Sequence, residues 1–552
     1  MKSRIFLLTA CFTLLLLCLL VVLQDWTAQE TREESPDNGS KASISVFRRK
    51  LQQPGADSQT AADAFQAVPP RKSPDTGAST TAESPSEVLR DRILTVSTKE
   101  DYQRLLQRIG ELGITPVRLI PRLHAAVISA QDLPLGEGLG REFPELNEEL
   151  DFPVTRPELP DANTVINGRP FDDGLLPWLG ISETDARRGQ GVTIAVLDEP
   201  VAATASLDNA SVHQLDLFGL CTGDSSGSHG NAVTSLLVAD SQSVRGIAPE
   251  AGILSIPVLN TEGTGSVAAV AEGIIAAVDS GADIITLSLG SETPSRALQK
   301  AVDYAVEHGT VIVAAAGNSG TSTPYYPAAC EGVIGVAACD AASNAMSFSN
   351  HGDAIDIAAP GCCIAADFGT GGESVLFSGT SAAAPCVAGV IATVLSASPD
   401  MTPAEAAQTV LDNTYDFGAP GTDSQYGHGV LSYTLIREAA NETYTDAVAT
   451  GQYLDLANAG TDSAKLYISA QNAGNTTLSG LTLVFSVNGI EHLSVFNDVG
   501  PRQTVTATVD VPKDQWDSIV VRSKVTSSEQ ESNEHNNSRS TRITVIEEEP
   551  IP

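Results

Sequence analysis

The chain has 552 residues, of which 42% are hydrophobic and 18% charged, and its formal net charge at pH 7 is -36. This length can hold two to four domains, and the composition is typical of a globular α/β protein with additional low-complexity sequence. The strong negative charge argues against nucleic acids and anionic membrane surfaces as partners, and solubility is the simplest explanation of the acidity.

The first residues form an apolar run with a basic flank. Lys2 and Arg4 precede the uncharged stretch 5–23, which is 19 residues long. This length lies at the lower end of what spans a bilayer and exceeds a typical signal-peptide core. The flank predicts an N-terminus inside and the rest of the chain outside. We therefore expect residues 1–26 to be a signal anchor, with a cleaved signal peptide as the alternative, and an exported chain that is membrane-anchored facing outside the cytoplasm or secreted.

Two segments follow before the largest part of the chain. Residues 27–88 are rich in Ser, Thr, Pro, Ala and acidic residues and poor in aromatics, which predicts a disordered linker. Residues 89–150 combine a strand pattern, a stretch with Leu105 and Ile109 on one helical face, and alternating residues after Val117. This second segment is expected to form a small α+β domain.

Residues 170–440 alternate short apolar strands with helices. Examples are the strands at 192–198 (VTIAVLD) and 310–316 (TVIVAAA) and the helices at 266–280 and 296–308. This alternation predicts a doubly wound α/β fold, a parallel sheet covered by helices on both faces. Sites in such sheets form beyond the carboxyl ends of strands, where Asp198, Ser288 and Asn318 are expected.

The stretch 377–389 (FSGTSAAAPCVAG) places Ser381 between a Gly-Thr step and an apolar helical pattern. A serine at such a helix start is a candidate nucleophile, and the plain alternative is an N-cap on a core helix. Suitable partners precede it in the chain: Asp198 ends a strand, His229 opens a helix and Asn318 follows another strand. These residue types are those of nucleophilic acyl transfer.

Asp198, His229 and Ser381 occur in the chain order of the subtilisin triad, and their motifs resemble those of the subtilisin-like serine proteases (subtilases, peptidase family S8). The resemblance runs from about Pro177 to Ala440. It includes stretches without candidate catalytic residues, which are GIAPEAGILSIPVL, ADIITLSLGS and IDIAAPG. It implies a serine endopeptidase acting through an acyl-enzyme, with these three catalytic residues and Asn318 in the oxyanion hole.

The resemblance also implies a self-processing zymogen. Residues 89–150 would be the inhibitory pro-domain, with an unrelated small α+β module as the alternative, and residues 142–169 would be the connection that passes the active site and is cut. The implied partners are protein or peptide substrates and the chain's own pro-domain, and the apolar N-terminal segment adds the membrane as an expected partner. No nucleic acid partner is expected.

By the same resemblance, substrate lies as an added strand between two edges, and a pocket receives the side chain before the scissile bond. Tyr325 stands where many relatives carry a glycine at the base of that pocket, which predicts a shallow pocket. The implied substrate-binding residues are Gly263, Thr264 and Gly265 at one edge, Ser288, Leu289 and Gly290 at the other, and Ala315, Ala316, Gly317 and Tyr325 in the pocket.

The chain departs from the family pattern beside Asp198, where Glu199 and Pro200 replace the usual Ser/Thr-Gly. A hydrogen bond that steadies the aspartate is then missing or replaced. This departure leaves a second interpretation open, a catalytically silent surface protein whose protease fold serves in binding or adhesion. The loop 239–245 is short for the calcium loop of many subtilisins, so no metal ligand or cofactor is assigned, and structural calcium elsewhere stays open.

Eight cysteines are present, and two of them lie in the apolar leader. The other six match no zinc spacing, and one or two disulfides are expected in an exported chain. Cys386, which follows the candidate nucleophile, is expected to be a small buried hydrophobe. These six residues are Cys221, Cys330, Cys339, Cys362, Cys363 and Cys386.

Residues 452–547 change to short alternating strands separated by Gly, Asn and Pro turns. This pattern predicts an all-β sandwich of about 90 to 100 residues. Its last part is similar to bacterial CARDB-type, immunoglobulin-like adhesion-related domains. No catalytic constellation stands there, so a spacer or a binding module is the expected role.

Overall fold

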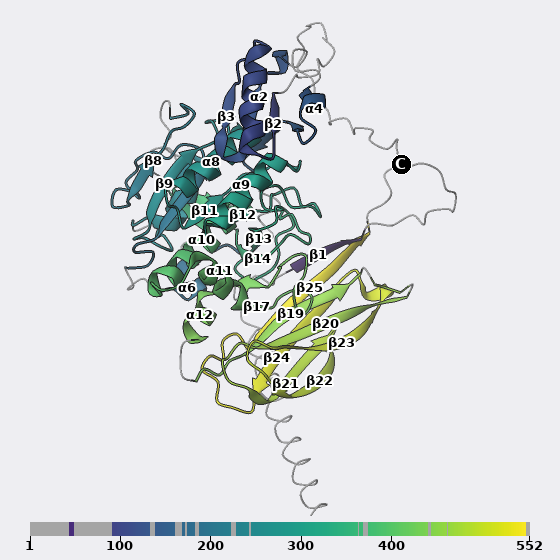
Figure 1. Cartoon of the computed structure of the whole chain (residues 1–552). Helices are drawn as coiled ribbons and strands as arrows, with labels where there is room; N and C mark the ends of the chain where they lie inside the picture. Colours follow the sequence, from purple (N-terminus) through teal and green to yellow (C-terminus); the bar gives the residue numbers. More distant parts are fainter. Residues whose placement is uncertain are drawn as a thin grey trace, which may run out of the picture. The chain divides into compact units, whose positions relative to one another are not determined.

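A computed structural model describes residues 43–48, 91–132, 139–160, 168–171, 174–182, 187–221, 228–241, 244–362, 364–367, 374–439, 443–456, 458–460 and 462–547. Figure 1 shows their helices and strands. The expected anchor or signal segment, residues 1–26, lies outside the described residues.

The central element is a nine-stranded sheet. Neighbouring strands of this sheet run parallel, except for the antiparallel pair at one edge that residues 414–415 and 430–431 form. The order is β17 (Thr414–Tyr415), β18 (Val430–Leu431), β14 (Ile357–Pro360), β13 (Val333–Cys339), β12 (Val311–Ala315), β11 (Ile284–Leu287), β7 (Thr193–Asp198), β9 (Gly252–Pro257) and β8 (Val212–Gln214). The predicted parallel sheet is therefore confirmed.

Helices cover both faces of this sheet (Figure 1). Alternate residues of one strand therefore enter two separate cores. Along β7, Ile194 and Val196 pack in one core, while Ala195 and Leu197 pack in the other. Because both faces are buried, the strands read as continuous apolar runs. One face carries α7 (His229–Val238), α10 (Thr380–Ala397) and α11 (Pro403–Asp412). The other face carries α8 (Val267–Asp279) and α9 (Arg296–Glu307). Two shorter helices, α6 (Leu175–Leu179) and α12 (Tyr433–Ala439), also belong to this domain.

The predicted small α+β segment has a four-stranded antiparallel sheet and a core of its own. Thr98 caps its main helix, and Tyr102, Leu105 and Ile109 of that helix are buried. The elements are β2 (Arg92–Thr95), α2 (Lys99–Glu111), β3 (Arg118–Ile120), η1 (Pro121–Leu123), β4 (Ala125–Ile128), η2 (Ala130–Asp132), α4 (Leu139–Glu142) and β5 (Asn147–Leu150).

The last part of the chain forms two sheets around a buried apolar cluster that includes Leu466, Leu483 and Trp516. The predicted β-sandwich is thereby confirmed. One sheet holds β19 (Ala447–Asp455), β20 (Ser463–Asn472) and β23 (Thr504–Pro512); the other holds β22 (Ile490–Val499), β21 (Leu478–Val487), β24 (Ile519–Ser527), β25 (Ser538–Glu547) and β1 (Ser43–Arg48), and η3 (Lys513–Gln515) follows β23.

β1 comes from the stretch that composition predicts to be a disordered linker, and it pairs in parallel with β25. Composition alone does not reveal this strand, because its partner lies at the other end of the chain. The remainder of 27–88 lies outside the described residues.

Among the described residues, one helix is long and apolar enough to cross a membrane, and this is α10. Most of α10 is buried within the domain, as in the core helix of a globular fold. Its Cys386 is fully buried, as expected, and the thiol donates to the Ala382 carbonyl at 3.2 Å. Cys221, Cys330, Cys339 and Cys386 are free thiols, so the expected disulfides do not form among these four.

Candidate active site

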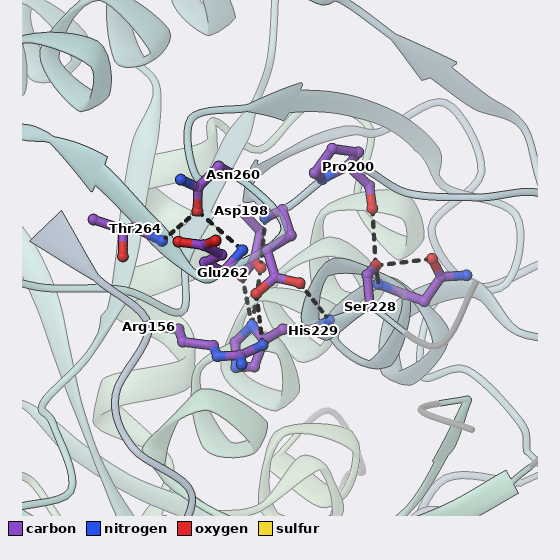
Figure 2. Close-up of polar contacts among 10 residues, drawn as sticks. Arg156, Asp198, Pro200, Ser228, His229, Asn260, Glu262 and Thr264 are labelled. Carbon is purple, nitrogen blue, oxygen red and sulfur yellow. Dashed lines mark hydrogen bonds and ion pairs between the residues drawn. The ribbon is translucent and has the colours of Figure 1, made fainter. Parts of the chain in front are cut away.

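A buried carboxylate and a buried imidazole meet at the carboxyl end of β7. Asp198 is the last residue of this strand, and His229 is the first residue of α7, whose N-cap is Ser228. The His229 Nδ1 atom lies 2.9 Å from Asp198 Oδ1 and 3.0 Å from Oδ2 (Figure 2). A carboxylate in this position fixes the tautomer of the ring and stabilises its protonated form.

Ser381 lies in the first turn of α10, which packs against α7. The preceding Gly379 has φ 127°, and a Cβ there would lie 2.7 Å from Asn318 Nδ2, so only glycine fits. The Ser381 hydroxyl is buried and makes no hydrogen bond within the part of the chain described, while the Ser381 carbonyl accepts one from Ser288 Oγ at 2.9 Å. The turn thus holds the backbone of the serine and leaves its hydroxyl available.

Asn318 follows β12 and is oriented by the same turn. Its Oδ1 accepts hydrogen bonds from the N–H and the hydroxyl of Thr380, both at 2.9 Å. The amide nitrogen of Asn318 donates to the carbonyl of Glu158 at 2.9 Å. An amide held in this way can stabilise negative charge that develops on a peptide carbonyl oxygen.

The chain itself supplies the peptide that lies beside Asn318. β6 (Pro153–Thr155) pairs antiparallel with β10 (Thr264–Ser266), and Thr155 exchanges two hydrogen bonds with Gly290, at 3.0 and 2.9 Å. The N–H of Arg156 donates to the Gly263 carbonyl at 3.0 Å. Both predicted edges therefore hold one extended segment between them.

Of the predicted pocket residues, Ala315 and Ala316 are fully buried, and Tyr325 packs between two glycines. A Cβ on Gly290 would lie 2.7 Å from Tyr325 Cβ, and one on Gly317 would lie 2.8 Å from its ring. The phenol contacts Ser319 Oγ at 2.5 Å and donates to Glu292 at 3.3 Å. Burial is the largest cause that raises the pKa of Tyr325, and the charges of Glu292 and Glu158 raise it further.

Residues 189–429 match the model of the "Subtilase family". Thermitase of Thermoactinomyces vulgaris is 37% identical over 266 residues, which are 46% of this chain and 91% of thermitase. The chain belongs to the subtilase family. A thermostable alkaline protease of Halalkalibacterium halodurans is 37% identical over 265 residues, 46% of this chain and 72% of that protein. This subtilase is a subtilisin-like serine-type endopeptidase.

A solved structure supports the fold of this subtilase. Fervidolysin from Fervidobacterium pennivorans, described as a keratinolytic enzyme related to subtilisin, has a TM-score of 0.54 at 18% identity. The match covers 83% of this chain and 91% of that chain. At this identity the likeness shows the fold alone.

Glu199 is a residue of this subtilase whose contacts the sequence does not reveal. Its side chain is buried, its N–H donates to Asp198 Oδ1 at 2.7 Å, and its Oε2 accepts from the His229 N–H at 3.1 Å. Its Oε1 forms an ion pair with Arg156 Nη1 at 2.7 Å. Asp198 therefore accepts a hydrogen bond from the backbone N–H of Glu199, the residue that departs from the Ser/Thr-Gly pattern.

The Glu199 carboxyl has an altered affinity for protons. Burial and the charge of Asp198 raise its pKa, while Arg156 and His229 lower it in part. An acidic residue directly after the candidate aspartate was the available signal in the sequence, but its partner Arg156 lies 43 positions away in the chain. Within the described residues, no group of three or more His, Cys, Asp and Glu side chains is arranged to hold a metal ion.

Proposed function

We propose that this subtilase hydrolyses peptide bonds through Ser381 as nucleophile, His229 as general base and Asp198 as the group that orients His229. The observation that carries the proposal is Asn318, which binds Thr380 next to the buried Ser381 hydroxyl and also binds a peptide carbonyl. Because the amide of Asn318 contacts both the turn that carries Ser381 and a peptide carbonyl, it indicates where the reacting carbonyl would lie.

The steps follow from these contacts. His229 takes the proton of Ser381 as the hydroxyl attacks the carbonyl carbon, and Asp198 stabilises the imidazolium through Nδ1. The oxyanion of the tetrahedral intermediate accepts hydrogen bonds from the Asn318 amide and the Ser381 N–H. His229 then protonates the leaving amine, and water hydrolyses the acyl-enzyme by the same route in reverse.

We propose further that residues 89–150 are an inhibitory pro-domain. The carboxylates of Glu149, within this segment, and of Asp151, directly after it, bind helix N-termini of the peptidase domain: Glu149 accepts from the N–H groups of Arg296 and Ala297, and Asp151 accepts from Ala268. Such positions favour negative charge, because the first N–H groups of a helix have no partner within it. The following segment then fills the cleft between Gly263 and Gly290.

The bond that we expect to be cut lies within this segment. The Glu158 carbonyl accepts the Asn318 hydrogen bond, and Leu159 is exposed beyond it. We therefore propose that the chain cuts itself between Glu158 and Leu159 and that the pro-domain inhibits until it dissociates.

Export and substrates complete the proposal. The basic flank and apolar run before residue 24 support an exported protein, tethered or secreted, that acts on protein or peptide substrates. The C-terminal sandwich is proposed to serve as a spacer or a binding module.

The test compares the parent with Ser381→Ala by intact mass, N-terminal sequencing and labelling with a serine-reactive fluorophosphonate. We expect the parent to acquire a new N-terminus at Leu159, and Ser381→Ala to remain intact, unlabelled and slower by at least about 10⁴-fold. Cutting and labelling of both chains alike would refute Ser381 as the nucleophile. An intact, unlabelled parent would favour the second interpretation, a silent scaffold.

A further inference from the structure

Glu199 is a buried carboxylate that the proposed reaction does not use. One of its oxygens is bound by the backbone of His229, and the other by the guanidinium of Arg156. The two partners belong to different parts of the chain, as Figure 2 shows for Arg156 and His229. Arg156 lies on the segment that pairs with Gly263 and Gly290. Once this segment leaves, Glu199 loses its cation but stays beside Asp198.

The backbone of Arg156 lies where a substrate residue would lie. Its N–H donates to Gly263, and the residue before it pairs with Gly290. A substrate that adds a strand between the same edges places one side chain in this position, two residues before the carbonyl bound by Asn318. The contact between Glu199 and Arg156 is therefore the contact of a subsite with its occupant.

The walls of this subsite suit a long side chain. A Cβ on Gly263 would lie 2.7 to 2.8 Å from Nε, Cδ and Cγ of Arg156, so the stem of the arginine runs directly over this glycine. The side chain of Arg156 is 37% exposed, whereas that of Glu199 is 3% exposed. The carboxylate of Glu199 thus lies at the buried end of the cleft, and the more exposed part of the cleft leaves room for a long cationic side chain.

Electrostatics favours a cation over a neutral side chain here. Glu199 and Asp198 are adjacent carboxylates, and the pKa of Glu199 is raised by burial and by Asp198. A guanidinium that reaches Glu199 offsets both effects and forms a charge-assisted hydrogen bond. An uncharged side chain leaves a buried carboxylate without a counter-ion, which is costly.

We propose that Glu199 is a specificity-determining residue and that this subtilase selects peptides with arginine, or lysine, as the third residue before the bond it cuts. This inference rests on the proposed function and adds a substrate class to it. The segment that precedes Glu158 fits the rule, since it carries Arg156 in that position.

The first test uses an internally quenched peptide with the sequence of residues 152–161 and a matched peptide with citrulline, the neutral isostere, in place of Arg156. We expect the parent to prefer arginine by about 10- to 100-fold in kcat/KM, and Glu199→Gln to lose most of this ratio, because a glutamine still accepts from His229 but carries no charge. Glu262→Gln removes an exposed charge next to Gly263 and is expected to keep the ratio within about threefold. Equal cleavage of both peptides by the parent, or an unchanged ratio in Glu199→Gln, would overturn the proposal.

The second test does not need catalysis. In the Ser381→Ala chain, hydrogen exchange of residues 152–158 reports how often the segment leaves the cleft. Arg156→Gln and Glu199→Gln should each lower its protection by about 10-fold, and the double variant should lose little more, because both remove one interaction. Additive losses would overturn the proposal. Non-additive losses, together with a parent chain that the fluorophosphonate never labels, would keep the subsite and refute only the proposed hydrolysis.

Discussion

Asn318 binds through both ends of its side-chain amide, so its two roles can be separated by substitution. Asn318→Asp keeps an oxygen for Thr380 and removes the donor toward the reacting carbonyl. We expect kcat to fall by at least about 100-fold with little change in KM, a magnitude known from subtilisin rather than calculated from this structure. Steady-state kinetics on a peptide substrate measures both.

The matched control is Thr380→Val, which removes the hydroxyl bound by Asn318 and leaves the amide donor in place. We expect its kcat to fall by less than about 10-fold. Equal losses in Asn318→Asp and Thr380→Val would mean that Asn318 only holds the turn before Ser381.

Tyr325 occupies space between Gly290 and Gly317, and the exposed Glu158 precedes the bond that we expect to be cut. A large apolar side chain at the Glu158 position would therefore find little room. We expect the parent to cleave peptides with Ala before the scissile bond faster than those with Phe or Leu, and Tyr325→Gly to reverse this order. Rates for peptides that differ only at this residue provide the measurement, and a parent that strongly prefers Phe or Leu would contradict the shallow pocket.

At the scale of elements, α9 begins with N–H groups that a carboxylate of the small α+β segment binds. Glu149 accepts from Arg296, Ala297 and the Ser295 hydroxyl, at 2.8 to 3.0 Å. We expect Glu149→Gln to weaken docking of the segment by about 10-fold, because the charge interacts with the helix dipole and with several donors. In the Ser381→Ala chain, the rate at which added chymotrypsin cuts residues 142–169 reports this docking.

Glu148 offers a neighbouring control. It is exposed and forms a long ion pair with Arg92, at 3.7 Å. Glu148→Gln should leave the chymotrypsin rate nearly unchanged, since exposed pairs contribute little. An equal acceleration by both variants would show that overall charge, rather than the contact with α9, holds the segment.

At the scale of the whole molecule, the stability of the C-terminal sandwich should depend on pH through Asp446. This residue is fully buried and bound by Asn536 and Tyr444, and burial raises its pKa to about 7. The unfolded chain, with an ordinary pKa, ionises first, so the free energy of unfolding falls between about pH 4 and pH 7 and is flat above. The carboxyl thus stabilises the fold when protonated and destabilises it when ionised.

Asp446→Asn removes this ionisation. We expect Asp446→Asn to lower the opening constant of β19 to β25, relative to the parent, by about 100-fold more at pH 8 than at pH 5. This factor corresponds to about 2.7 kcal/mol in the free energy of unfolding. Hydrogen exchange on the most protected amides of these strands, in the full chain, measures it. Comparing the two chains at each pH cancels the intrinsic exchange rate. A parent-to-variant ratio that does not change with pH would contradict an elevated pKa at Asp446.

The sequence by itself determined the class of the fold and the candidates for the chemistry. The strand that ends at Asp198 and the helix that contains Ser381 are marked by apolar periodicity and turn residues within about 15 positions, which is the range that local pattern carries. Continuous apolar strands also predicted a sheet buried on both faces, because only such a sheet has two cores. The candidate residues then followed from their places at strand ends and helix starts.

Only the tertiary structure decided what these residues contact. Glu199 meets Arg156, Asn318 meets the Glu158 carbonyl, and β1 meets β25, each across a separation in sequence that no local pattern encodes. In the sequence, Glu199 is only a departure from the family pattern beside Asp198. Its contacts in the structure identify it as part of a candidate subsite. The physical reason is that periodicity records which side of an element is buried, whereas partners across a cleft depend on how distant elements pack.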